Sequence, residues 1–236
     1  MKVRGERECR SCGVRWSYYE TGSVACPECG SVRSRGVGER AEHTAGPATL
    51  DLSAARAAVE EDPLREVAER AAEAGAEYTR QAGFVHAGEL QPLSGTYLAA
   101  AELRRVGTTL ARSMRADETA ELYFLSLLDG ADAGERPPPE EVPDVLRSDR
   151  GLAVAAGADA YVSDVRRLVE DSGPGLAEAF SALRARRKRI EALDGDVDPS
   201  EAERVVRALR DVGAYIRADD ERALVRARER LDRSLV

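Results

Sequence analysis

Apolar positions recur every three to four residues from Leu50 to the end of the chain, which is the spacing of amphipathic helices. The apolar stripes are Leu64, Val67, Ala68 and Ala71; Leu98, Leu103, Val106 and Leu110; Leu122, Leu125 and Leu128; Val154 to Val169; Leu176, Phe180, Leu183, Ile190 and Leu193; Val205, Leu209, Val212 and Ile216; and Leu224 and Leu231. Short polar or glycine-bearing breaks separate these stripes. The pattern therefore predicts an antiparallel helical bundle.

Polar and proline-bearing segments between the stripes predict where several helices begin and end. Asp117 is expected to cap the start of one helix, and Gly130 is expected to end it. Residues 137–139 are prolines, which cannot continue a helix and predict an extended spacer. Asp198-Pro199-Ser200-Glu201 resembles a capping box with proline at the first helical position. A division of the helical domain is expected near 130–143.

The first forty residues follow a different pattern. Val14 to Tyr19 alternates and is rich in strand-forming residues, Thr21 to Ser23 predicts a turn, and Val32 to Arg35 predicts another short strand. Gly36 to Pro47 has glycines and no clear period, which is typical of a linker. The fold class expected is mainly α with a small N-terminal β module. The expected domains are a ribbon at 1–38, a linker at 39–49 and a helical domain at 50–236.

All four cysteines lie in the N-terminal module, as two Cys-x-x-Cys pairs separated by thirteen residues: Cys9 with Cys12, and Cys26 with Cys29. Two thiolates on one tight turn can point at a common centre. Two such turns supply the four sulfurs in a tetrahedron that a structural zinc ion favours. We expect one structural Zn²⁺ in a zinc ribbon, with iron in a rubredoxin-like site as the main alternative. Four thiolates leave no open coordination position, so catalytic zinc is disfavoured.

Composition restricts the class of protein. No stretch approaches the roughly 18 apolar residues of a membrane span, and the charged N-terminus has no apolar signal segment. A reducing, cytoplasmic location is therefore expected, which favours metal binding over disulfides. Lysine occurs only at Lys2 and Lys188, asparagine is absent and the net charge is −8. This balance is expected of a GC-rich genome and a salt-adapted cytoplasm.

Basic and aromatic residues of the ribbon are candidate contacts for nucleic acid or for a partner: Arg15, Trp16, Tyr18, Arg33 and Arg35. Trp16 and Tyr18 would either stack on bases or cover the zinc site and dock the ribbon on the helices. The second interpretation is favoured, because a small module has few other residues to bury. Residues 1–40 carry eight basic and five acidic side chains. A zinc tetrathiolate would lower that net charge by about two, so a strong polyanion-binding footprint is absent.

A second group of candidate contacts is the basic run of Arg184, Arg186, Arg187, Lys188 and Arg189. It would form either a phosphate-binding patch or a solvated face that pairs with the acidic middle of the chain. The absence of asparagine, with glutamine only at positions 81 and 91, disfavours specific readout of adenine.

No catalytic constellation is visible. His43 and His86 are the only histidines; the cysteine quartet is complete without His43, and His86 is expected in a loop. With lysine only at positions 2 and 188, the chain has no Gly-x-x-x-x-Gly-Lys phosphate loop. An enzyme is not expected.

The segments Arg4 to Cys9, Trp16 to Val24, Cys26 to Gly30 and Glu42 to Pro47 resemble an uncharacterised family of haloarchaeal proteins with a zinc ribbon of the transcription factor B type. In transcription factor B the ribbon contacts RNA polymerase, and cyclin-like helical repeats bind promoter DNA. Only the four cysteines match that pattern here. No cyclin repeat is visible, so the resemblance implies a ribbon and not promoter binding.

Three functions are compatible with these features. The first is a non-enzymatic adaptor whose ribbon docks on a large cytoplasmic machine, polymerase or ribosome, so that its partner is a protein or a ribonucleoprotein. The second is a nucleic-acid-binding regulator that uses the ribbon arginines and the basic run at 184–189. The third is a structural zinc protein whose helical bundle oligomerises.

Overall fold

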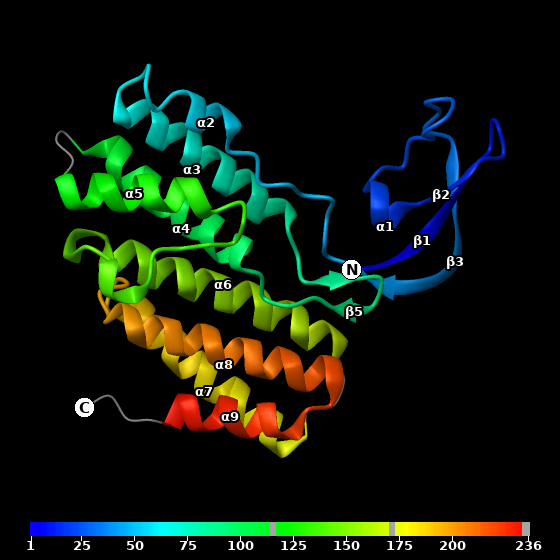
Figure 1. Ribbon diagram of the computed structural model, residues 1–236. Helices are drawn as coiled ribbons and strands as arrows, with labels where there is room; N and C mark the ends of the chain where they lie inside the picture. The colour runs from blue at the N-terminus through cyan, green and yellow to red at the C-terminus, as the bar shows by residue number, and fades with distance from the viewer. Residues whose placement is uncertain (114–116, 170–172, 233–236) are drawn as a thin grey trace.

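The computed structural model describes residues 1–113, 117–169 and 173–232 (Figure 1). Within them, a small antiparallel sheet at the N-terminus is followed by a body of packed helices, so the predicted fold class is confirmed. The ribbon projects from one side of the helical body, and its cysteine-bearing end points away from the helices (Figure 1). The last residues of the expected helical domain, 233–236, lie outside the described part.

The ribbon is a three-stranded sheet with the order β2-β1-β3. Strand β1 (Lys2–Cys9) lies in the centre and pairs antiparallel with β2 (Arg15–Ser17) and with β3 (Ser34–Glu42). The sequence pattern did not predict β1, because its residues are mostly charged and only Gly5 and Cys9 are buried. Pairing with two neighbours, and not an apolar face, holds this strand in place.

Residues Tyr18–Thr21 form the short helix α1, so the prediction of a strand through Tyr19 is wrong. The Ser17 hydroxyl accepts a hydrogen bond from the backbone N–H of Glu20 at 3.2 Å. Gly22, at φ 61°, donates its N–H to the carbonyl of Tyr18 at 2.8 Å. A side-chain cap at one end and a left-handed glycine at the other outweigh the strand propensity of the tyrosines.

The helical body contains the following elements. They are α2 (Ser53–Ala57), α3 (Leu64–Gln81), α4 (Gly95–Arg112), α5 (Glu118–Gly130), the 3₁₀ turns η1 (Pro139–Glu141) and η2 (Asp144–Leu146), α6 (Arg147–Leu168), α7 (Pro174–Ala192), α8 (Pro199–Ala218) and α9 (Glu221–Asp232). A two-residue hairpin of β4 (Val85–His86) and β5 (Glu89–Leu90) lies between α3 and α4.

Two of the predicted helix starts are confirmed, and two local predictions are not. Asp117 caps α5 by accepting from Thr119, and Asp198 caps α8 by accepting from Ser200. Gly130 is the last residue of α5 and Ala131 remains right-handed, so Gly130 does not act as the left-handed cap. Glu201 does not close a capping box; its side chain is buried and faces Arg189 instead.

Helices α3 and α4 approach closely because glycine and alanine line their contact. A methyl group on Gly75 would lie 2.5 Å from the carbonyl oxygen of Ala100, and one on Gly107 would lie 2.5 Å from that of Ala68. Larger side chains at these positions would push the helices apart. The alanine-rich composition therefore produces a backbone-to-backbone contact in place of a wide aromatic core.

Two apolar cores fill the helical body. One joins α2, α3 and α5 to most of α4, and the other joins α6 to α9 with the start of α4 and the β4-β5 hairpin. Ala131 and Val142, in the segment 130–143 where a division was expected, pack in the first of these cores. The division itself stays a prediction. The proline run there is not a free spacer: Pro137 is buried, and its carbonyl accepts from Arg150 Nη1 at 3.3 Å.

A buried ionic network connects the two cores. Glu102 on α4 is fully buried and accepts from Arg150 Nη1 on α6 at 2.8 Å and from Arg136 Nη1 at 3.2 Å. Arg136 also donates to Glu203 on α8 at 3.0 Å. Tyr123 on α5 donates its hydroxyl to Glu102. Arg150 Nη2 also lies 3.5 Å from Glu203, so two arginines share two carboxylates. Because loss of Glu102 would leave both cations with one carboxylate, the network fixes the relative positions of these helices.

The segment predicted as a linker is not a free spacer. Strand β3 continues to Glu42 and so includes the first four residues of the linker expected at 39–49. Thr44 then donates its hydroxyl to Asp164 on α6 at 2.6 Å, and its backbone N–H donates to Val85 at 2.8 Å. Phe84 N–H donates to the same Asp164 oxygen at 2.8 Å. The ribbon is thus held on the body by hydrogen bonds at its base.

Candidate metal centre

The two cysteine pairs lie on knuckles with matching backbone geometry. The N–H of Gly13 donates to the carbonyl of Cys9 at 3.1 Å, and the N–H of Gly30 donates to the carbonyl of Cys26 at 3.0 Å. Both glycines have positive φ, 81° and 67°, as the reversal of the chain requires. The sequence repeat Cys-x-x-Cys-Gly therefore predicted both turns.

The four sulfurs are gathered as a metal site requires. All lie within 4.8 Å of one another. Cys9 Sγ is 3.7 Å from Cys29 Sγ, and Cys12 Sγ is 3.5 Å from Cys26 Sγ. Sulfurs bound tetrahedrally at 2.3 Å would be about 3.8 Å apart, whereas a disulfide bond is only about 2 Å long. The predicted grouping of these four residues is confirmed, and their distances fit a shared ion and not disulfides.

The shifted pKa values of the Cys9, Cys12 and Cys29 thiols are the second feature that fits a bound cation. Backbone N–H groups of Cys12 and Ser11 lower the pKa of the Cys9 thiol to about 6. The N–H of Val14 favours the thiolate of Cys12, but the neighbouring thiols and burial raise the pKa of Cys12 to about 12. The pKa of Cys29 is raised as well; the N–H of Ser31 opposes that shift. Four thiolates so close together can form at neutral pH only if a positive ion lies between them.

Trp16 belongs to the wall of this centre. It is 9% exposed and packs with Cys9 and Cys26 in one apolar cluster, and its indole N–H donates to the carbonyl of Ser23 at 3.0 Å. A ring buried in this way is not available for stacking on bases. Trp16 therefore covers the cysteine cluster, which is the interpretation favoured from the sequence.

Two of the ribbon arginines share one carboxylate. Glu8 on the central strand lies opposite Arg15 on β2 and Arg35 on β3, and it binds them at 3.0 and 2.9 Å. These arginines, chiefly Arg35, lower the pKa of Glu8. Arg33 lies near the knuckle end, is exposed and has no side-chain partner among the described residues. Of the three candidate arginines of the ribbon, Arg15 and Arg35 are therefore neutralised across the strands by Glu8, and Arg33 has no side-chain partner among the described residues.

Tyr18 and both histidines lie at the base of the ribbon, where it meets the body. The ring of Tyr19 is 4.6 Å from that of His43, which is 5.2 Å from His86; Tyr18 lies 6.4 Å from His43. His86 Nε2 is 3.5 Å from a carboxylate oxygen of Glu20. His86 lies on strand β4 and not in a loop. No sequence pattern indicated this cluster, because Tyr18 and Tyr19, His43 and His86 are distant along the chain and share no motif.

Some residues of the basic run on α7 have side-chain partners, and others have none among the described residues. Arg186 donates to the carbonyl of Leu231 at 2.6 Å, and Arg189 lies 3.4 Å from Glu201. Arg187 binds Asp159 on α6 at 3.1 Å and Glu191 at 2.9 Å. For Arg184 and Lys188, no ion pair or hydrogen bond of the side chain occurs among the described residues. The run is therefore not one basic patch.

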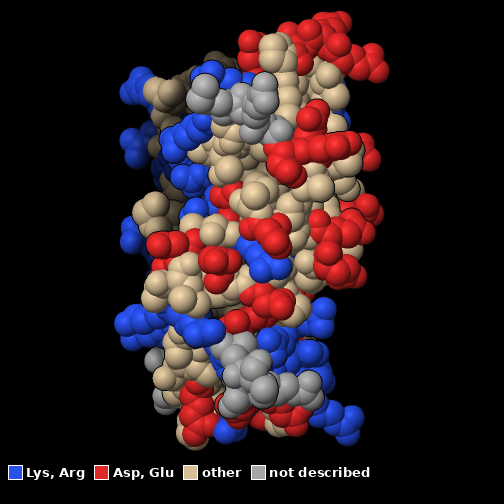
Figure 2. Space-filling model, turned by 90° about the vertical axis from the view of Figure 1, so that its left-hand side faces the viewer, with Lys and Arg blue, Asp and Glu red and all other residues tan. Residues whose placement is uncertain are grey.

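Charge on the body is mixed. On the face shown in Figure 2, acidic side chains gather along one edge and basic side chains along the opposite edge. Within the described residues, no helix combines the length and the hydrophobicity that crossing a bilayer requires.

Comparisons with known proteins place the chain in one family of unknown function. No curated protein and no solved structure matched the chain. The sequence profile of a family of unknown function, DUF7117, matches residues 1–231, which include both the ribbon and the helical body. The chain belongs to this DUF7117 family.

Proposed function

We propose that this protein is a non-enzymatic adaptor in which a zinc ribbon docks on a large cytoplasmic machine of transcription or translation. The observation that carries the proposal is the geometry of the ribbon: its base is hydrogen-bonded to the helical body, while its cysteine-bearing end projects away (Figure 1). An exposed tip on a fixed base suits binding to a second macromolecule.

Zinc is the ion that the site favours. Four thiolates at tetrahedral spacing suit Zn²⁺, which has no preferred geometry of its own and needs no redox partner. All four coordination positions would be taken by protein, so the ion would stabilise the fold and leave no position for substrate. A thiolate site also fits a reducing compartment such as the cytoplasm. Elemental analysis of the purified protein tests this point: one zinc per chain is expected, and one iron with a red, rubredoxin-like absorption would contradict it.

The tip carries a surface suited to a partner. Val32 and Val24 are 72% and 46% exposed, although valine is ordinarily buried. Arg10 and Arg33 are exposed beside them on the same end of the ribbon. Arginine is enriched at protein interfaces, and apolar side chains exposed together on one surface mark interaction sites. The resemblance to transcription factor B ribbons suggests a polymerase-like or ribosome-like partner.

Affinity purification from native lysate at native salt, followed by mass spectrometry, tests this docking. Val32→Asp places a charge at the tip without touching a cysteine. Val225→Asp is the matched control, because Val225 is 53% exposed on α9 and far along the chain from the ribbon. Loss of one set of partners with Val32→Asp, and its retention with Val225→Asp, is expected. Retention of the same partners by both variants and by Cys26→Ser would overturn the proposal.

Nucleic-acid binding by the ribbon and the whole basic run has less support. Arg15 and Arg35 share Glu8, and Arg187 binds Asp159. The ribbon and the basic run therefore do not act as wholes: in the run, only Arg184 and Lys188 have no side-chain partner among the described residues.

A further inference from the structure

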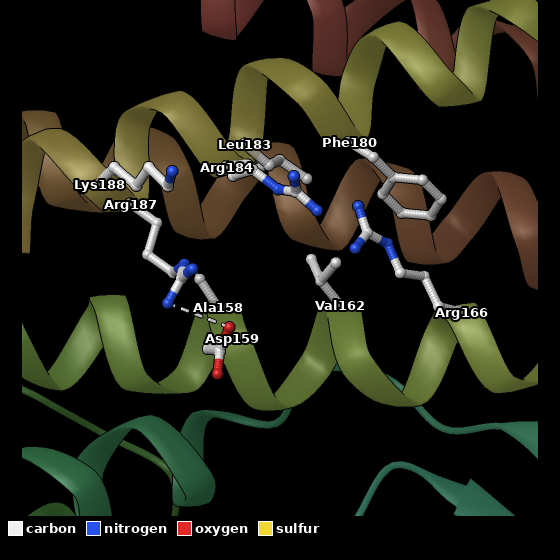
Figure 3. A pocket seen from close by; sticks show the side chains of 9 residues that line it. All are labelled: Ala158, Asp159, Val162, Arg166, Phe180, Leu183, Arg184, Arg187 and Lys188. Carbon is white, nitrogen blue, oxygen red and sulfur yellow. Dashed lines mark ion pairs between the residues drawn. The ribbon is translucent and has the colours of Figure 1, made fainter.

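A cleft of about 190 Å³ lies between helices α6 and α7 on the surface of the body (Figure 3). Its floor is apolar, formed by Val162 on α6 and by Leu183 and Phe180 on α7. Four cationic side chains and one carboxylate complete the lining, so the cleft is strongly positive although the whole chain carries −8.

The positive side chains reach the cleft from both helices. Arg184, Arg187 and Lys188 lie three and four residues apart on α7, the spacing that places side chains on one face of a helix. Arg166 comes from α6 and lies over the ring of Phe180, 5.2 Å from its centroid. Figure 3 shows Arg184 and Arg166 reaching into the cleft from opposite walls.

Most of this charge is not neutralised by the protein. Arg187 is bound by Asp159 at 3.1 Å and by Glu191 at 2.9 Å. For Arg184, Lys188 and Arg166, the described residues supply no carboxylate within ion-pair distance. Like charges that face one another across a cleft repel, and an anion between them would remove that repulsion.

We propose that this cleft binds a phosphate-bearing ligand with a planar or apolar part, the chemistry of a nucleotide. Guanidinium groups match the oxygens of phosphate through paired hydrogen bonds, and lysine adds a point charge. Several cations suit a group that carries more than one negative charge better than a single carboxylate. The apolar floor then accommodates the sugar or base. The phosphate comes either from a free nucleotide or from the backbone of a nucleic-acid strand.

Asp159 is the one acidic residue of the cleft. It holds Arg187 at one end and repels an incoming phosphate. Its removal would take away one negative charge and one of the two carboxylates that bind Arg187, while Glu191 remains. Asp159→Asn is therefore expected to bind the ligand more tightly than the natural chain does.

The experiment uses the full-length, metal-loaded chain with three probes: inorganic phosphate, ADP and a short fluorescein-labelled single-stranded RNA. Binding is followed by calorimetry and fluorescence anisotropy. Arg184→Ala with Lys188→Ala is expected to weaken binding roughly tenfold or more, because two charge-assisted contacts are lost. Both side chains are exposed, so the double variant is expected to fold.

The matched control is Arg207→Ala with Arg222→Ala, which removes two exposed arginines of α8 and α9 from outside the cleft lining. This control is expected to retain binding. Binding of ADP identifies a free nucleotide as the source of phosphate, and binding of RNA alone identifies a strand. Equal weakening in both double variants, tighter binding of a polyglutamate peptide than of ADP and RNA, or no binding of any probe by the natural chain would overturn the proposal.

Discussion

The ribbon and the helical body are stabilised in different ways. Only Cys9, Trp16 and Cys26 form the buried apolar cluster of the ribbon, whereas the body contains two extended apolar cores. A module of about forty residues rarely folds on its own core and needs a metal or disulfides. The chain thus combines a region whose few buried residues gather around a candidate metal site with a region that has extended packing and a buried ionic network.

The sharpest test of this difference is removal of the metal. Cys26→Ser, or a strong zinc chelator, is expected to unfold the ribbon, because structural zinc supplies roughly 10–16 kcal/mol of binding free energy in small modules. Trp16 is the only tryptophan and lies against the cysteines, so its fluorescence should shift to the red. Far-UV circular dichroism should keep its helical signal. Restored fluorescence after zinc is added back to the chelated protein is the control, and simultaneous loss of the helical signal would contradict the separation.

The opposite test removes one charge of the buried network in the body. Glu102→Ala removes the fully buried carboxylate and leaves Glu203 as the remaining carboxylate of Arg150 and Arg136, so the free energy of unfolding should fall by about 3–5 kcal/mol. Urea unfolding followed by far-UV circular dichroism measures the change. The matched control is Glu229→Ala on α9, which is exposed and should change stability by less than about 0.5 kcal/mol. If the Trp16 fluorescence transition moved by as much as the helical one, the two regions would not be independent.

A smaller effect is expected where α3 and α4 touch. Gly107→Ala would place a methyl group 2.5 Å from the carbonyl oxygen of Ala68, which forces the helices apart and costs about 1–3 kcal/mol. Gly173→Ala is the control, since a methyl group there meets no atom within 4 Å. Thermal unfolding of both variants compares them. Equal melting temperatures would mean that the close approach of the helices does not limit stability.

The smallest effect concerns the contact between the two regions. Burial, followed by the charge of His86, lowers the pKa of His43 below its ordinary value of 6.5. The folded state therefore prefers neutral His43; its contribution is complete above 6.5 and declines as the pH falls through the lowered folded-state value. The protection factors of the amides at residues 43–46, which correct the exchange rates for the intrinsic pH dependence of amide exchange, should fall with acidification. His43→Gln should reduce that pH dependence, and body amides of α4 should show none of it.

Features of the fold that depend on residues close in sequence were predictable, and those that depend on residues distant in sequence were not. The caps at Asp117 and Asp198, the helix stripes and the cysteine knuckles depend on residues close in sequence, and the structure contains them. Strand β1 escaped prediction because it is charged, and α1 replaced a predicted strand because Ser17 caps it. The hydrogen bond that joins the base of the ribbon to α6 was not predicted either, because Thr44 and Asp164 are 120 residues apart in the sequence.

The sequence by itself determined the cluster of four cysteines, the fold class and most helix positions, because spacing and periodicity are local properties that the backbone geometry turns directly into structure. Only the tertiary structure decided which charges remain free. Arg184 and Lys188 face a cleft while Arg186, between them, turns toward Leu231, and Arg15 and Arg35 share Glu8. The physical reason is that an arginine is neutralised by whichever carboxylate or carbonyl folding brings beside it, and that neighbour can lie anywhere along the chain.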